Sequence, residues 1–179
     1  MSAWHVDLRP HFNARAATSN DERARCGFNA WGNSFPAEEL TFGEVIEVDG
    51  IPFRLERSGE LDHVEADRQH IALPRTDATA LALLAFGEMG PQRTRIVVEG
   101  DGEPHTIDAL AAGWLVAGTF QVERALDCTH LHYPGDYELS HLRPVMWPYV
   151  YALPRSRNWR RLRIEPSPLF HFAAATLLA

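Results

Sequence analysis

The chain of 179 residues has a formal net charge of −7 and a pI near 5.7, so it lacks the basic surface with which proteins bind nucleic acid. Lysine is absent, which excludes Schiff-base and phosphate-loop lysines. No apolar run reaches the roughly 18 residues of a membrane span, and no secretory signal opens the chain. We therefore expect a cytoplasmic protein with one domain over residues 1–179.

Strand signals begin with residues 4–8 and are clearest in a hairpin over residues 43–56, GEVIEVDGIPFRLE. Asp49-Gly50 is typical of a two-residue type I′ turn. With that turn Val48 pairs with Ile51, and the apolar side chains of both strands share one face. Turn chemistry and alternation thus predict the same hairpin.

A second hairpin is predicted over residues 94–108, with its turn at Gly100-Asp101-Gly102. The other predicted strands are 69–74, 80–88, 145–154, 159–165 and 169–178. The run ALALLAF within 80–88 also fits a short helix by periodicity, but its length and neighbours favour a buried strand. Many short strands separated by Gly, Pro and Asp predict an all-β fold, an antiparallel β-sandwich of jelly-roll type.

Basic residues gather near the last two strands, at Arg155, Arg157, Arg160, Arg161 and Arg163. Alternation places Arg163 on an exposed strand face. We interpret the cluster as a solvated edge strand, with an anion site as the alternative.

Two long segments, residues 13–40 and 120–144, show no obvious strand pattern. Long irregular segments in a compact domain often carry function. We therefore expect them to enclose a shared pocket.

Four stretches together resemble a known family: residues 6–16 (VDLRPHFNARA), 27–40 (GFNAWGNSFPAEEL), 48–55 (VDGIPFRL) and 169–178 (LFHFAAATLL). They are similar to a galactose-binding-like β-sandwich domain, a carbohydrate-binding module of the kind appended to actinobacterial glycoside hydrolases. The resemblance implies a jelly roll that binds a sugar-like ligand. Because no hydrolase domain accompanies it here, we expect a stand-alone ligand-binding protein.

Sugar binding uses flat aromatic faces together with side chains that hydrogen-bond hydroxyl groups. Trp31 lies in the first long segment between two asparagines, which supplies that mixture. The predicted ligand-binding residues are Trp31, Asn29, Asn33, Tyr133, Tyr137 and Trp147. Trp147 alternates with Tyr149 and Tyr151 along one strand, and the alternative is that these three rings belong to the core.

The second hypothesis is a small tailoring enzyme of secondary metabolism, of cyclase or isomerase type. Its general acid–base residues would be His130, His132, Asp136 and Glu138, whose pKa values burial could tune. The same segment with His141 also fits a Zn, Fe or Mn site, similar to the His-x-His arrangement of cupins. The alternative to both is a set of surface histidines on a loop.

A structural Ca²⁺ ion is the one cofactor predicted, because sandwiches of this kind often hold one near the N-terminal loop. Asn13 and Asp21 are its candidate ligands, with Asn20 beside them. Solvated loop side chains are the alternative.

Two further sets of side chains receive structural interpretations. His63, Glu65 and His70 are interpreted as part of a polar loop. Cys26 and Cys128 are expected to be buried thiols, with a disulfide left open. The expected partner is a small-molecule or saccharide ligand, with neither nucleic acid nor membrane; a homodimer and a protein–protein interaction domain remain open.

Overall fold

The computed structural model describes residues 2–23, 27–118, 121–135, 137–154 and 158–179. Within these ranges the chain is all β apart from three short 3-10 turns, η1 (Arg9–His11), η2 (Asn20–Glu22) and η3 (Ala37–Glu39). The predicted antiparallel β-sandwich is confirmed. No helix in the described ranges is long and apolar enough to cross a membrane.

Two large antiparallel sheets form the sandwich. The seven-stranded sheet has the order β1-β17-β8-β15-β11, with β6 beside β17 and β12 beside β15. Its strands are β1 (Ala3–His5), β17 (Ser167–Leu178), β8 (Ala80–Gly87), β15 (Leu142–Ala152), β11 (Leu115–Ala117), β6 (Val64–Ala66) and β12 (Leu126–Asp127). The four-stranded sheet consists of β10 (His105–Ala111), β9 (Gln92–Gly100), β16 (Trp159–Ile164) and β7 (His70–Thr76), in that order.

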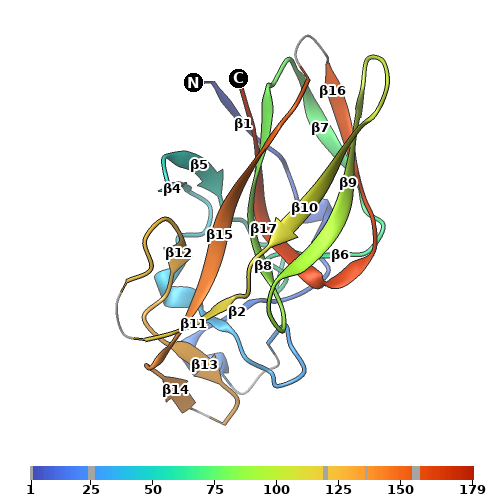
Figure 1. Ribbon diagram of the computed structural model, residues 1–179. Coiled ribbons are helices and arrows are strands. Elements are labelled where there is room, and N and C mark those ends of the chain that lie inside the picture. Colours follow the sequence, from blue (N-terminus) through green and yellow to red (C-terminus); the bar gives the residue numbers. More distant parts are fainter. Residues whose placement is uncertain (1, 24–26, 119–120, 136, 155–157) are drawn as a thin grey trace.

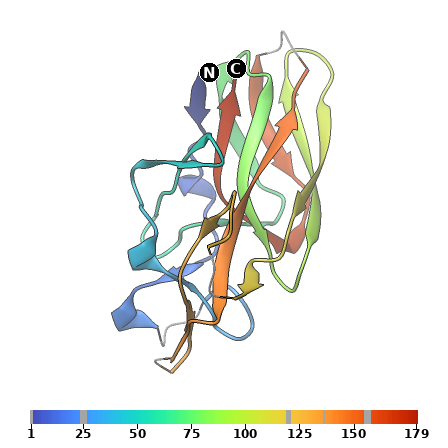
Figure 2. The same ribbon diagram turned by 60° about the vertical axis from the view of Figure 1, so that its left-hand side comes forward.

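A third, irregular layer covers part of the outer face of the seven-stranded sheet (Figure 1, Figure 2). It contains the N-terminal loops and three short strand pairs. The pairs are β2 (Ala17–Thr18) with β3 (Phe35–Pro36), β4 (Val45–Val48) with β5 (Ile51–Arg54), and β13 (Leu131–Tyr133) with β14 (Tyr137–Leu139). The two long segments predicted without strands therefore contain short ones.

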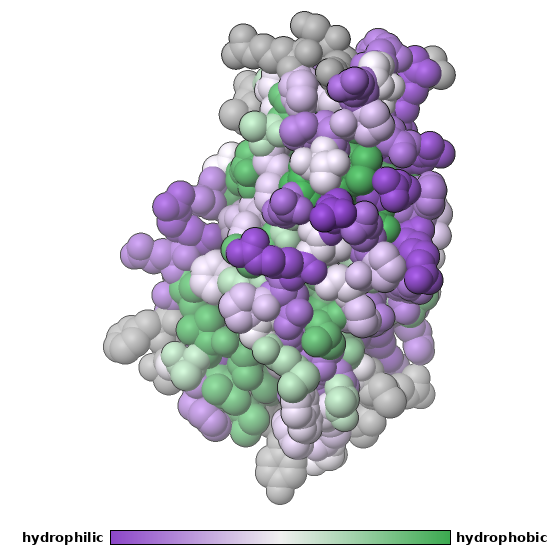
Figure 3. All heavy atoms as spheres, turned by 45° about the vertical axis from the view of Figure 1, so that its right-hand side comes forward, coloured by the Kyte–Doolittle hydropathy of each residue, from purple (hydrophilic) through white to green (hydrophobic). Residues whose placement is uncertain are grey.

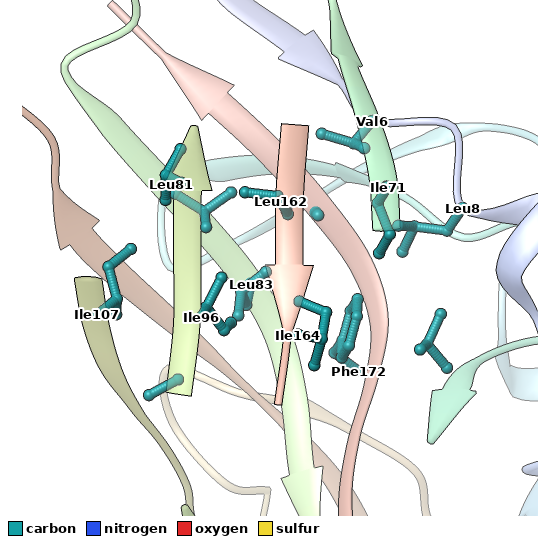
Figure 4. Close-up of a cluster of buried hydrophobic side chains, with 14 of the residues drawn as sticks. Val6, Leu8, Ile71, Leu81, Leu83, Ile96, Ile107, Leu162, Ile164 and Phe172 are labelled. Carbon is teal, nitrogen blue, oxygen red and sulfur yellow. The ribbon is translucent and has the colours of Figure 1, made fainter. Parts of the chain in front are cut away.

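The first core fills the space between the two large sheets (Figure 4). Ile96 and Leu162 come from the four-stranded sheet, and Leu83 and Phe172 from the seven-stranded one; all four are fully buried. Burial of such side chains supplies the main driving force for the sandwich.

A second core lies between the seven-stranded sheet and the third layer. Along β8, Leu83 packs in the first core, whereas Leu84 and Phe86 pack in the second. Both faces of β8 are thus buried, which explains why its sequence is an unbroken apolar run instead of an alternating one.

Both predicted hairpins are present. Asp49 and Gly50 have φ values of 51° and 75°, as the type I′ turn requires, and Val48 pairs with Ile51. The second hairpin is formed by β9 and β10. Each of the other predicted strand segments overlaps an observed strand.

The prediction of an edge strand for the arginine cluster is wrong, because β16 lies between β9 and β7. Arg160 forms an ion pair with Asp101, and Arg161 and Arg163 lie beside Glu99. Arg155 and Arg157 lie outside the described residues. In the view of Figure 3, hydrophilic side chains predominate along the right-hand side, and hydrophobic side chains gather at the lower left.

Replacing Phe172 with Ala is expected to lower the free energy of unfolding by about 3–5 kcal/mol, because it leaves a cavity in the first core. Urea unfolding measures the change. The control is Val150→Ala on β15, where the side chain is 52% exposed and a change within about 0.5 kcal/mol is expected. Equal losses in the two variants would contradict this description of the core.

Candidate functional site

A chain of buried titratable side chains lies on the outer face of the seven-stranded sheet. The Asp62 carboxylate accepts hydrogen bonds from the backbone N–H groups of Ala16 and Ala17, at 2.7 and 2.8 Å. The same carboxylate lies 2.9 Å from Nδ1 of His63. His63 Nε2 in turn lies 3.2 Å from Nδ1 of His171. The three side chains are at most 3% exposed.

The order of these contacts assigns the ring hydrogens. An ionised carboxylate only accepts hydrogen bonds, so Nδ1 of His63 carries the hydrogen that faces Asp62. In the neutral ring Nε2 of His63 is then an acceptor, and Nδ1–H of His171 donates to it. Nε2 of His171 consequently carries no hydrogen, and it has no hydrogen-bond partner among the described residues.

Glu88 lies beyond this open end of the chain. Its Oε2 atom is 3.9 Å from Nε2 of His171, which is too long for a hydrogen bond. Burial raises the pKa of the Glu88 carboxyl, against the effect of a hydrogen bond from the Ala30 backbone. Burial, and then the neighbouring His63, lower the pKa of His171 to about 3. A proton-free imidazole nitrogen therefore faces a carboxyl group that keeps its proton more readily than usual.

Aromatic rings surround the two histidines. Phe86 stacks on His171 with ring centroids 5.1 Å apart and an angle of 11° between the planes. The Phe28 ring contacts His171 edge-on at 5.5 Å and Trp114 at 4.7 Å. These rings exclude water from the imidazoles, and the resulting low polarity strengthens the hydrogen bonds of the chain.

The end of β8 places Glu88. Gly87 donates its N–H to Ala112 O, and its carbonyl accepts the N–H of Trp114. A Cβ atom on Gly87 would lie 2.4 Å from the carbonyl oxygen of Gly90, so this close approach requires glycine. The next residue, Glu88, is thereby directed toward the second core.

The register of β17 places His171. Phe170 and Phe172 pack in the first core, so the intervening His171 faces the other side of the strand. A register shift between Phe172 and Ala174 follows immediately, and bulges of this kind are enriched beside functional sites.

A surface cleft with a volume of about 380 Å³ lies next to the buried chain. It is lined by Trp31, Asn33, Met89, Gly90, Gly113, Trp114 and Leu115. Met89 and Gly90 directly follow Glu88, and Trp114 contacts the Phe28 ring. The cleft and the buried chain therefore share the β8–β9 turn and the 27–33 loop.

The 27–33 loop presents an aromatic ring and Asn33 at this cleft. Trp31 is 52% exposed. Asn29 Oδ1 accepts the backbone N–H groups of Trp31 and Asn33, which fixes the loop. Nδ2 of Asn29 and Oδ1 of Asn33 are buried without a hydrogen-bond partner in the described part of the chain.

The two long segments are brought together in the third layer. Ser34 and His132 exchange two backbone hydrogen bonds of 3.0 and 3.1 Å. The His132 ring is fully buried, with Nδ1 3.0 Å from Oγ1 of Thr18. His130 lies beside it with ring centroids 5.1 Å apart and pairs with Glu39 at 2.9 Å.

The remaining predicted ligand-binding residues, Tyr133, Tyr137 and Trp147, lie in β13, β14 and β15. Tyr133 is 37% exposed, and Trp147 donates its indole N–H to Gly113 O, at one wall of the cleft. Asp136 lies outside the described residues. Tyr137 and Glu138 belong to β14 by their backbone, but their side chains also lie outside the described part of the structure.

The candidate calcium ligands Asn13 and Asn20 form hydrogen bonds with different parts of the protein. The Asn13 amide pairs with the backbone of Glu65, and Asn20 Oδ1 accepts from Arg23. Asp21 lies in η2. No group of three His, Cys, Asp or Glu side chains in the described ranges is arranged to hold a metal ion. A structural Ca²⁺ site remains a prediction.

Cys128 is a buried free thiol, and burial raises its pKa. Cys26 lies outside the described residues.

The buried chain is the part of the site that sequence reasoning missed. The interpretation of His63 as a polar-loop residue is wrong, since its side chain is fully buried. Asp62, Glu88 and His171 were not candidates. The available signal was a polar residue inside or directly after an apolar strand, as for His171 in LFHFAAATLL and Glu88 after ALALLAFG.

One family model, described as AziU2-like beta-sandwich domain, matches residues 2–178. No curated protein matches the chain. The β-sandwich implied by the resemblance to galactose-binding-like domains is confirmed, whereas its carbohydrate-binding role stays a prediction.

The stability of the protein should depend on His171 below neutral pH. The unfolded chain protonates this imidazole near pH 6.5, while the folded protein resists protonation down to about pH 3. Stability is therefore lost as pH falls below 6.5, by up to about 1.4 kcal/mol per pH unit. Urea unfolding of wild type and His171→Phe between pH 5 and 7.5 should show a shallower pH dependence in the variant. Parallel profiles would rule out the lowered pKa.

Proposed function

The chain belongs to the AziU2-like β-sandwich domain family, and we propose that this member binds a small sugar-like ligand in the cleft beside Trp31. The observation that carries the proposal is the combination of an exposed indole face with two buried polar atoms that lack partners in the described ranges. An aromatic face with a few polar groups that fix orientation is the usual composition of a small-molecule site.

The two asparagine atoms that lack partners in the described ranges indicate the chemistry of the ligand. Oδ1 of Asn33 accepts a hydrogen bond and Nδ2 of Asn29 donates one. A hydroxyl group both donates and accepts, so a polyhydroxylated ring can pair with Asn33, which lines the cleft, while its C–H face packs on Trp31. The volume of about 380 Å³ suits a ligand of one or two rings.

The family membership is compatible with a role in secondary metabolism, as the second sequence-based hypothesis expected. Of the four acid–base residues named for that hypothesis, His130 and His132 lie in the third layer and do not line the cleft. The side chains of Asp136 and Glu138 lie outside the described part of the structure. An enzymatic role is favoured by a different observation, the pairing of His171 with Glu88 next to the cleft.

Titration calorimetry with a panel of neutral monosaccharides, including galactose and glucose, tests the proposal. We expect measurable binding of at least one member and a loss of about tenfold or more in affinity for Trp31→Ala, because the variant removes the stacking face. Val45→Ala is the matched control, since Val45 is 51% exposed but lies in β4 and does not line the cleft.

If no saccharide binds to folded protein, or if the two variants lose affinity equally, the assignment of the ligand to this cleft is wrong.

A further inference from the structure

We propose that Asp62, His63 and His171 form a proton relay, in which Nε2 of His171 accepts a proton from an N–H or O–H group of a ligand held beside Glu88. The inference shares the cleft with the proposed function, but it makes no use of saccharide binding. Asp62 and His63 act in it as positioning residues.

The unpartnered nitrogen of His171 is the first argument. The ring is fully buried among Phe86, Phe28 and the apolar strand β17. A buried acceptor without a hydrogen bond costs free energy, and the hydrogen bond that Nδ1 of the same ring donates to His63 does not satisfy Nε2. The role of the ring as a donor to His63 therefore leaves its open Nε2 atom unexplained.

The Asp62 end of the buried chain is anchored to the backbone, which is the second observation in support of the relay. Asp62 is held by two backbone N–H groups, and each imidazole donates in the direction of this carboxylate. When Nε2 of His171 takes up a proton, its Nδ1 hydrogen can pass to Nε2 of His63 across 3.2 Å. The positive charge then rests on His63, which faces Asp62 at 2.9 Å. No atom is gained besides the accepted proton, and the reverse steps return it.

Glu88 defines what the open end can bind. Its carboxyl oxygen and Nε2 of His171 are 3.9 Å apart, so one hydroxyl or amino group placed off the line between them can contact both within normal hydrogen-bond distance. The Glu88 side chain is 9% exposed and precedes the cleft residues Met89 and Gly90. The pair therefore lies beside the cleft, and it places a proton acceptor opposite a carboxyl group, an arrangement suited to proton transfer on a bound substrate.

The tautomers test the relay directly in the intact protein. Imidazole nitrogen NMR spectra of the ¹⁵N-labelled chain should show His171 with hydrogen on Nδ1 and none on Nε2 from pH 5 to 8. His63→Gln should keep this tautomer, because its side-chain oxygen can accept the Nδ1 hydrogen. His63→Phe cannot accept it, and should move hydrogen onto Nε2 in part of the molecules. Hydrogen on Nε2 of the wild-type protein, or the same tautomer in both variants, would overturn the proposal.

Acylation by diethyl pyrocarbonate tests whether the nitrogen is available. The reagent transfers its ethoxycarbonyl group to an imidazole nitrogen that carries no hydrogen, with loss of carbon dioxide and ethanol. We expect acylation of His171, located by mass spectrometry, at rates within about twofold between pH 7.5 and 5.5. Added N-acetylhistidine, with an ordinary pKa of about 6.5, should slow about tenfold over the same interval.

Phe28→Ala should accelerate the acylation of His171 about tenfold, since the Phe28 ring contacts both the imidazole and the cleft wall. Phe42→Ala is the matched control, because Phe42 packs against Arg57 and does not line the cleft. If His171 stays unmodified in Phe28→Ala, or is modified only above pH 6.5, the relay does not open to the cleft. Saccharide binding with no acylation of His171 would support the proposed function and refute the relay. Acylation of His171 with no saccharide binding would support the relay and refute the proposed function.

Discussion

The central strands β8 and β17 of the seven-stranded sheet are buried on both faces along most of their length, and this constraint determines the rest of the molecule. One face packs on the four-stranded sheet and the other under the third layer. A polar side chain on the second face has no water to bind and must find its partner inside the protein. Asp62 and His63 do so through the backbone of the third layer and through each other.

The third layer is itself held together by polar contacts more than by regular sheet. Its strand pairs are two to four residues long, and the backbone bonds between Ser34 and His132 join its two segments. The cleft lies where this layer meets the β8–β9 turn. A layer of short strands can present an exposed ring such as Trp31 at its margin, while the sandwich beneath supplies rigid support.

The hairpins could be predicted because their information is local: Asp49-Gly50 and the alternation around it lie within one short segment. Trp31 and Asn33 line the cleft, and an aromatic residue between amides is visible in a single stretch; the role of Trp31, Asn29 and Asn33 in ligand binding stays a prediction. Glu88 and His171 could not be predicted, because β8 and β17 are adjacent in the sheet but far apart in the sequence. The arginines of β16 indicated an exposed face correctly, but an exposed face does not distinguish a central strand from an edge strand.

Strand β17 follows every other described strand in the chain, yet it lies between β1 and β8 near the middle of its sheet. Neither core can close before this strand has been synthesised and inserted between its partners. A ribosome-bound chain that lacks it would expose apolar surface of both cores at once, so folding is coupled to completion of this segment. His171 arrives with the same strand, and the buried chain of titratable groups is therefore among the last features of the molecule to form.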